Sequence, residues 1–288
     1  MSAPPPLGLV LDVDGPVASP VSRTVARPML DDMLVLLAAG VPVVLNTGRS
    51  AAFVTEHLLE PLAAAGLPAA ARLHAVCEKG GVWTTGGPDG AGEVHVDPAL
   101  RVPAVASELL ADLVGRGYGD AMFVDGTKRV MATVEARTDV PPEFYAGRRR
   151  GFDADLVAGL TAAGLGCRLH DRAYPDAAGR TPWRIDPSVI ATDVESADSG
   201  KALGVRRGLA LLAGEGPLPR AWHTVGDSRG DYAMADQLHA LGHEVTHVDV
   251  GPEPPLTDRP YRVTTVDDAT YEAAGAAHLR ALARRWAI

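Results

Sequence analysis

The chain has 288 residues, 47% of them hydrophobic, and a formal net charge of −9 at neutral pH. This length accommodates one domain or two with a sizeable core, whereas the negative charge argues against a general nucleic-acid-binding protein. No apolar stretch is long enough to cross a bilayer, and the two cysteines, Cys77 and Cys167, are too far apart in sequence to form a CxxC pair.

The N-terminus carries prolines at positions 4–6 and lacks the basic and apolar regions of a signal peptide. Together with the sparse cysteines, which are typical of a reducing compartment, this predicts a cytoplasmic protein without disulfide bonds. The sequence does not indicate an oligomeric state.

The first 82 residues alternate between apolar runs and helical spacing. Strand-like runs lie at 9–11, 41–45 and 73–76, and apolar residues recur at helical spacing over 28–40 and 50–66. This order is typical of a parallel sheet with crossover helices, so residues 1–82 are predicted to form the first part of an α/β core domain.

Residues 83–190 follow a different pattern. Helical spacing near 105–117 precedes two short strands at 122–124 and 130–134, which flank a turn formed by Asp125 and Gly126. A further helix is expected over about 153–164, followed by extended segments at 167–170 and 183–190. This mixture predicts an inserted α+β domain.

The first pattern resumes over residues 191–288, the predicted second part of the core domain. A helix is expected from Lys201, a strand at 222–225, a helix beyond Asp231, a strand at 244–250 and a C-terminal helix over 271–286.

Polar side chains follow several of the predicted core strands. Asp12 and Asp14 follow the first strand, Thr47 the second, and Asp227 and Asp231 the strand at 222–225. Because the carboxyl ends of parallel strands meet at one edge of a sheet, these residues are expected to converge there. Carboxylates this close favour a cation, and their oxygen atoms suit Mg²⁺. A lysine at the start of a later helix, at position 201, adds a positive charge.

This constellation resembles the haloacid-dehalogenase superfamily of phosphatases. Four motifs occur in the family's order: Asp12-Val13-Asp14-Gly15, Thr47-Gly48-Arg49, Ser199-Gly200-Lys201 and the acidic loop from Gly226 to Asp231. The resemblance implies a Rossmann-like parallel-sheet core with an inserted α+β cap of the C2 type, as in the branch of sugar-phosphate phosphatases.

The resemblance also implies a mechanism. Asp12 would attack phosphorus and form an aspartyl-phosphate, and Asp14 would protonate the leaving oxygen and later deprotonate water. Mg²⁺ would be held by the Asp12 carboxylate, the backbone carbonyl of Asp14, Asp227 and Asp231.

The phosphoryl oxygens would be held by Thr47, by the backbone N–H of Gly48 and by Lys201. The predicted partner is therefore a small phosphorylated metabolite such as a sugar phosphate, with no nucleic acid or membrane involved. A phosphomutase or phosphotransferase on the same fold is the alternative within the family, and a non-catalytic binding protein is another.

Three positions depart from the family pattern. Pro16 stands where Thr or Val is usual, Gly230 where Asn commonly precedes the last Asp, and Lys79 where the capped branch often has Asn between Glu and Gly. These departures bear on substrate handling and rate more than on the chemistry itself.

Two further segments match the sequence motifs of other enzyme classes. Residues 226–230 fit the G-x-S-x-G nucleophile elbow, so a serine esterase that uses Ser228 with Asp267 and His278 is the alternative from another enzyme class. Residues 243–247 fit H-E-x-x-H, but this zinc motif requires a helix. Because the segment is predicted to be a strand, we interpret the match as chance.

Overall fold

The computed structural model describes residues 7–286, so the prolines at 4–6 lie outside the described residues. The chain divides into two compact units: Met1–His95 with Gly200–Ile288, and the intervening Val96–Ser199. The second unit is thus an insertion in the first. It begins later than the segment 83–190 of the sequence analysis, because the strand from residue 82 pairs within the sheet of the first unit, and it ends later, because the strand Ala191–Ser196 pairs within the sheet of the second unit.

The first unit is built on a nine-stranded sheet in the order β15-β14-β13-β1-β2-β3-β4-β5, with β6 paired to β4. The strands from β15 to β3 are parallel, and β4 and β5 are added antiparallel at one edge. Their bounds are β1 (Leu7–Leu11), β2 (Val43–Asn46), β3 (Leu73–Cys77), β4 (Val82–Gly87), β5 (Gly90–Ala91), β6 (His95–Val96), β13 (Ala221–Gly226), β14 (Glu244–Asp249) and β15 (Arg262–Thr264).

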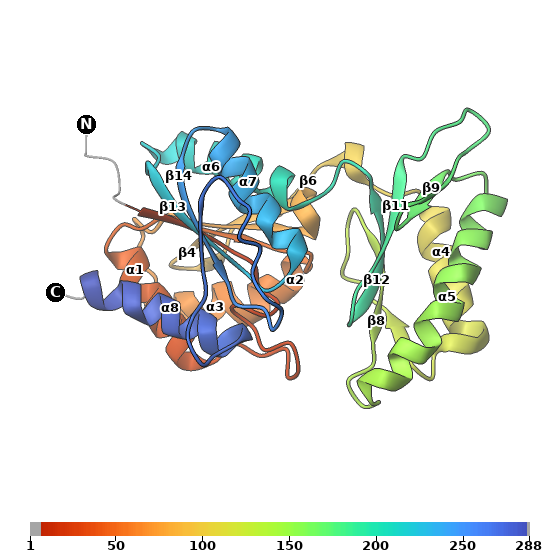
Figure 1. Ribbon diagram of the computed structural model, residues 1–288, viewed down its shortest axis with the longest axis horizontal. Coiled ribbons are helices and arrows are strands. Elements are labelled where there is room, and N and C mark those ends of the chain that lie inside the picture. Colours follow the sequence, from red (N-terminus) through yellow and green to blue (C-terminus); the bar gives the residue numbers. More distant parts are fainter. Residues whose placement is uncertain (1–6, 287–288) are drawn as a thin grey trace. The chain divides into compact units, whose positions relative to one another are not determined.

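Helices flank this sheet (Figure 1). They are α1 (Arg27–Ala38), α2 (Ala51–Val54), α3 (Glu60–Ala64), α6 (Lys201–Glu215), α7 (Tyr232–Ala240) and α8 (Tyr271–Trp286). A π-helical turn, Thr55–Leu59, joins α2 to α3, so the helix predicted over 50–66 is one irregular helical segment. In Figure 1, α6 and α7 lie on one side of the sheet, and α1 and α8 on the other.

The core of the first unit explains why these segments adopt their structures. Every residue of β1, β2 and β3 is buried, as the continuous apolar runs predict for a parallel sheet covered on both faces. On the side covered by α6 and α7, Val10 and Trp222 from neighbouring strands pack against Leu209 and Met234. The predicted α/β fold class with a parallel core sheet is confirmed.

The second unit has a six-stranded sheet in the order β10-β9-β11-β12-β8-β7. Only the β11–β9 pair is parallel among these strands. The elements are α4 (Ala104–Leu113), β7 (Met122–Val124), β8 (Ala132–Ala136), α5 (Pro142–Ala162), β9 (Cys167–Leu169), β10 (Arg172–Tyr174), β11 (Trp183–Pro187) and β12 (Ala191–Ser196). This is the predicted α+β insertion, but its second helix begins at Pro142, earlier than the predicted residue 153.

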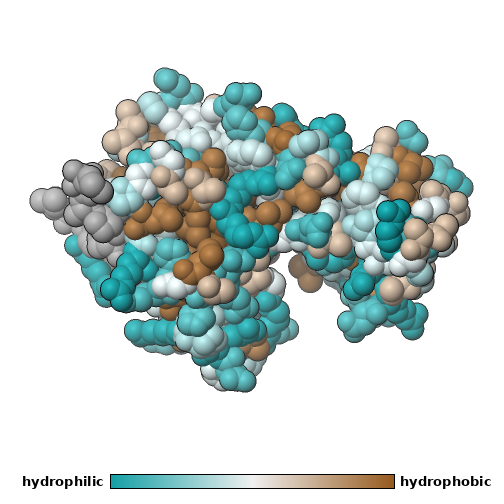
Figure 2. All heavy atoms as spheres, turned by 90° about the horizontal axis from the view of Figure 1, so that it is seen from above, coloured by the Kyte–Doolittle hydropathy of each residue, from teal (hydrophilic) through white to brown (hydrophobic). Residues whose placement is uncertain are grey.

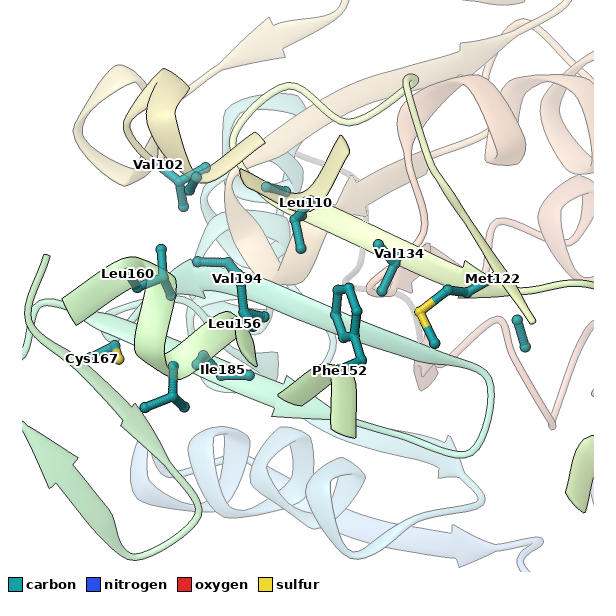
Figure 3. Close-up of a cluster of buried hydrophobic side chains, with 14 of the residues drawn as sticks. Val102, Leu110, Met122, Val134, Phe152, Leu156, Leu160, Cys167, Ile185 and Val194 are labelled. Carbon is teal, nitrogen blue, oxygen red and sulfur yellow. The ribbon is translucent and has the colours of Figure 1, made fainter. Parts of the chain in front are cut away.

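One face of this sheet packs on α4 and α5 (Figure 3). Phe152 and Leu156 of α5 and Leu110 of α4 meet Val134 and Val194 of the strands, and all five side chains are buried. The second unit therefore has a hydrophobic core of its own, as an independently folding domain requires.

Hydrophilic residues surround smaller hydrophobic areas on the face shown in Figure 2. Among residues 7–286, no helix is both long and apolar enough to cross a membrane.

Candidate active site

The first predicted site residue, Asp12, directly follows β1. Its backbone N–H donates to the carbonyl of Val225 in the neighbouring strand β13, and its own carboxylate accepts from the N–H of Val13 at 2.7 Å. The side chain is only 8% exposed. Burial raises the pKa of Asp12 well above its ordinary value, although the neighbouring Lys201 acts in the opposite direction.

Lys201, the first residue of α6, connects three strand ends. Its ammonium lies 2.6 Å from Asp12 Oδ1 and 2.9 Å from Asp231 Oδ1, and donates to the backbone carbonyl of Asn46 at 2.8 Å. In return, the buried Asn46 side chain donates to the Lys201 carbonyl at 2.8 Å. Although burial disfavours the ammonium ion, the two carboxylates outweigh it and raise the pKa of Lys201. The lysine therefore stays charged at neutral pH.

Asp231 is fully buried at the end of a short 3-10 turn that follows β13. Its Oδ2 accepts from the N–H groups of Asp227 and Ser228 at 3.2 and 3.0 Å and from the Ser228 hydroxyl at 2.7 Å. Burial works against its ionised form, but Lys201 and the Ser228 hydrogen bonds outweigh it and lower the pKa of Asp231. Asp231 is therefore a fixed negative charge behind the lysine.

Asp227 lies against the loop that carries Asp12 and Asp14. A Cβ atom placed on Gly15 would be 2.4 Å from Asp227 Cγ, and Gly15 has a φ of +92°, so only glycine fits at this position. Burial, with the nearby Asp231 carboxylate, raises the pKa of Asp227 to about 7.

Three of the acidic side chains form a candidate cation site. One carboxylate oxygen from each of Asp12, Asp227 and Asp231 lies within 4.8 Å of the others. Oxygen donors with this much negative charge suit a hard divalent cation such as Mg²⁺. The carboxylate of Asp14 does not belong to this group, and the predicted ligand set includes only the backbone carbonyl of that residue.

Asp14 instead forms a close ion pair with Arg49. The guanidinium Nε lies 2.9 Å from both carboxylate oxygens, and a second nitrogen lies 2.7 Å from Oδ1. The Arg49 side chain is nearly buried, whereas Asp14 is one-quarter exposed. The predicted acid–base residue is therefore positioned by an arginine from the loop after the neighbouring strand.

Thr47 and Gly48 occupy that same loop. Thr47 is fully buried, and its hydroxyl oxygen accepts from the backbone N–H of Arg49 at 3.1 Å, which fixes the turn and leaves the hydroxyl hydrogen able to donate. The carbonyl of Thr47 accepts from the N–H of Lys79 at 2.9 Å.

Asn46, Arg49 and Ser228 also support the site, through hydrogen bonds to Lys201, Asp14 and Asp231, and the sequence analysis did not predict these contacts. Arg49 stands in the second motif, but nothing in the sequence shows that its side chain reaches Asp14. For Asn46, the sequence shows only that it lies at the end of a predicted strand, and this does not indicate a contact with Lys201.

The two motifs that match other enzymes occupy different surroundings. The Ser228 hydroxyl donates to Asp231, and the His278 ring is hydrogen-bonded to the His223 ring at 3.1 Å, so these two side chains have different partners. His247 lies in strand β14, as predicted, and not on a helix with His243.

No protein-family model matches the chain, and no curated protein matches it. Solved structures do. A haloacid dehalogenase-like hydrolase from Bacteroides thetaiotaomicron is 12% identical with a TM-score of 0.60, and the match covers 96% of this chain and 98% of that one. A protein of Thermoplasma acidophilum is 14% identical with a TM-score of 0.56 and 97% of both chains covered.

Trehalose-6-phosphate phosphatase from Aspergillus fumigatus is 18% identical with a TM-score of 0.52, and the match covers 97% of this chain and 93% of that one. At these identities the similarity establishes the fold. The chain shares its fold with these structures, one of which is a haloacid dehalogenase-like hydrolase, and this is the fold that the resemblance carried by its four motifs predicts.

Proposed function

We propose that the chain is a Mg²⁺-dependent phosphomonoesterase that acts through an aspartyl-phosphate on a small phosphorylated metabolite. The observation that carries the proposal is the contact of Asp12 and Asp231 with one partly buried lysine, Lys201, beside Asp227. Such a site combines a carboxylate nucleophile, fixed positive charge and a set of cation ligands, the parts that phosphoryl transfer requires.

In the first step, a carboxylate oxygen of Asp12 attacks phosphorus as the bond from phosphorus to the ester oxygen breaks. The leaving ester oxygen takes its proton from Asp14, so Asp14 must first leave the ion pair with Arg49 and take up a proton from solvent. The pairing with Arg49 therefore controls where the acid–base residue points.

In the second step, water attacks the phosphorus of the aspartyl-phosphate, Asp14 takes the proton from that water, and the bond between phosphorus and Asp12 breaks. Free phosphate and the original carboxylate result. The Thr47 hydroxyl and the Gly48 N–H would hold phosphoryl oxygens from the loop after β2. Mg²⁺ held by Asp12, Asp227, Asp231 and the Asp14 carbonyl would neutralise phosphoryl charge.

The proposed substrate class is a sugar phosphate or a similar small phosphate ester. The name of the Aspergillus fumigatus structure, a trehalose-6-phosphate phosphatase, supports this class, as does the large α+β insertion. We further propose a cytoplasmic location, because Cys77 and Cys167 are both buried and neither is in a disulfide bond.

Hydrolysis of p-nitrophenyl phosphate by the full chain tests the proposal, with Mg²⁺ and with EDTA. We expect Mg²⁺-dependent turnover that Asp12→Asn abolishes. Asp89→Asn is the matched control, because it makes the same change at an exposed turn between β4 and β5.

Turnover that survives both EDTA and Asp12→Asn would contradict the proposal. If Ser228→Ala then abolished it, the serine-esterase alternative would stand instead. Transfer of the phosphoryl group between two positions of a sugar phosphate, without release of phosphate, would identify a phosphomutase.

A further inference from the structure

The first unit contains a cavity of about 250 Å³ apart from the candidate active site. Residues of β13, β14 and β15 line it on one side, and residues of α8 line it on the other. Its polar lining consists of His223, Thr246, Arg262, Thr264, His278 and Arg285. His223 precedes Asp227 by four residues, and a strand rises about 3.3 Å per residue, so the cavity lies about 13 Å from the acidic cluster.

The register of the sheet and the repeat of the helix bring these side chains together. His223 pairs with Thr246, and Thr246 pairs with Arg262, so the three side chains stand in a row on one face of the sheet. His278 and Arg285 are seven residues apart on α8, which is close to two full turns, so both project from the same face of that helix. Regular elements therefore hold the lining side chains in place.

The two histidines form a hydrogen-bonded pair, with 3.1 Å between His223 Nδ1 and His278 Nε2. Burial and the positive charges of Arg285 and Arg262 lower the pKa of His223 to about 4. Burial, the neighbouring ring and Arg285 lower the pKa of His278 to about 4 as well. Both rings are therefore neutral at pH 7. Whichever ring accepts the shared hydrogen bond carries a hydrogen on its second nitrogen, so one N–H is left to donate elsewhere.

The basic side chains of the cavity have no counter-charge. Arg262 and Arg285 are exposed, and within residues 7–286 neither guanidinium makes a hydrogen bond or an ion pair. Glu244, two residues before Thr246 on β14, is paired with Arg220 at 3.0 Å. The charged groups that act on the two histidine rings are all basic. Positive charge thus gathers here, and the described lining residues include no carboxylate.

We propose that this cavity binds a phosphate group, carried either by inorganic phosphate or by a small phosphorylated metabolite. A guanidinium offers a planar fork of N–H donors that fits two oxygens of an oxyanion, and Arg262 and Arg285 belong to different elements, β15 and α8. The Thr246 hydroxyl and the remaining imidazole N–H add neutral donors. A tetrahedral phosphate can accept from all of these groups at once, whereas a carboxylate has only two oxygens.

A pair of histidines is also a common metal-binding arrangement. Here, however, the two guanidinium groups repel a cation, and the hydrogen bond between the rings occupies one nitrogen of each. The cavity therefore suits an anion. Because it is separate from the candidate active site, this proposal does not depend on the proposed function.

Isothermal titration calorimetry of the full chain with inorganic phosphate, at pH 7, low ionic strength and in EDTA, tests the proposal. Low ionic strength limits the screening of exposed charges, and EDTA removes cations from the candidate active site, whose carboxylates then repel an anion. We expect Arg285→Gln and Arg262→Gln each to weaken phosphate binding by about tenfold, the size of one charge-assisted hydrogen bond. Arg284→Gln is the matched control, because Arg284 is also exposed on α8 but does not line the cavity.

Two further measurements identify the ligand and its place. Glycerol 2-phosphate is titrated in parallel: tighter binding of the ester indicates a phosphorylated metabolite, and tighter binding of inorganic phosphate indicates the free ion. In NMR spectra, phosphate should shift the ring signals of His223. It should not shift those of His243, which packs against Trp222 on the side of the sheet covered by α7.

The proposal is overturned if neither phosphate nor the ester binds to the folded chain in EDTA, or if Arg285→Gln and Arg262→Gln bind phosphate as tightly as the unaltered chain. It is also overturned if Arg284→Gln weakens binding as much as Arg285→Gln, since general surface charge would then account for the affinity. Hydrolysis of p-nitrophenyl phosphate with Mg²⁺ is a separate result: its absence would contradict the proposed function and leave this site unaffected.

Discussion

Replacing Lys201 with Met tests how the candidate site is held together. The substitution keeps much of the side chain's length but removes the charge that Asp12 and Asp231 share at 2.6 and 2.9 Å. Asp12 is 8% exposed and Asp231 is fully buried, so water cannot replace the lost ammonium at either carboxylate without rearrangement. Removing one partner of a buried ion pair costs about 3–5 kcal/mol, because the other partner stays buried and uncompensated.

We therefore expect Lys201→Met to lower the free energy of unfolding by about 3–5 kcal/mol, and the midpoint of thermal unfolding by about 10 °C. Urea titration in EDTA, followed by tryptophan fluorescence, measures the first quantity, since Trp222 is fully buried in the same unit. Mg²⁺ should reduce the loss, because a bound cation compensates the same carboxylates.

A double-mutant cycle identifies the cause. Asp231→Asn removes one of the two carboxylates that lose their cation, so the Lys201→Met/Asp231→Asn variant should be clearly more stable than the sum of the two single losses predicts. If Lys201→Met unfolds at the same urea concentration as the unaltered chain, or if the two losses simply add, the ion pairs do not stabilise this part of the structure.

Two further predictions concern the surroundings of the site. Gly204→Ala should lower the thermal unfolding midpoint, because the added Cβ would lie 1.9 Å from Asn46 Oδ1. Gly214→Ala in the same helix should raise the midpoint, because its added Cβ meets nothing within 4 Å and alanine favours the helix. Equal shifts for the two variants would contradict the packing argument. Burial lowers the pKa of His247 to about 4, so this side chain binds fewer protons in the folded than in the unfolded chain below pH 6.5, and its own contribution to stability should fall by about 2 kcal/mol between pH 7 and pH 5. Urea titration at the two pH values should show a smaller fall for His247→Gln, and an equal fall would refute the assignment.

The parts of the site that the sequence predicted follow from parallel topology. Asp12, Thr47 and Asp227 each come directly after a strand of the core sheet, and β1 pairs with both β2 and β13. Once the apolar runs are identified as parallel strands, their carboxyl ends must share an edge. The convergence of these residues therefore needs no knowledge of any individual side-chain contact.

The directions of individual side chains in the site could not be predicted from the sequence. The contact between Arg49 and Asp14 spans 35 residues, and nothing in the local pattern distinguishes an arginine that reaches a carboxylate from one that faces solvent. The same holds for the Asn46 side chain, which contacts Lys201 across 155 residues. Such contacts depend on rotamers selected by the whole surrounding loop.

The predicted start of α5, at residue 153, was wrong for a different reason. The helix begins at Pro142, a favourable first position, but its first half contains two glycines and three consecutive arginines, and this weakens the apolar periodicity. The buried side chains of Tyr145 and Phe152 then fix the helix by tertiary packing on the sheet of the second unit. Periodicity alone detects only the later, more regular half.

The contacts of Lys201 explain why the four motifs form one site although they lie far apart in the sequence. Its ammonium contacts Asp12 after β1, the Asn46 carbonyl at the end of β2 and Asp231 beyond β13, so the ends of three adjacent strands each bring one oxygen to it. The three oxygens surround the lysine together only when β1 has paired on both sides, and one of those pairings joins β1 to residues beyond position 220. The site therefore assembles only with the complete core sheet. Hydrogen exchange of the Asp12 N–H, which donates to Val225 across that pairing, should consequently require an opening as costly as the most stable one in this unit.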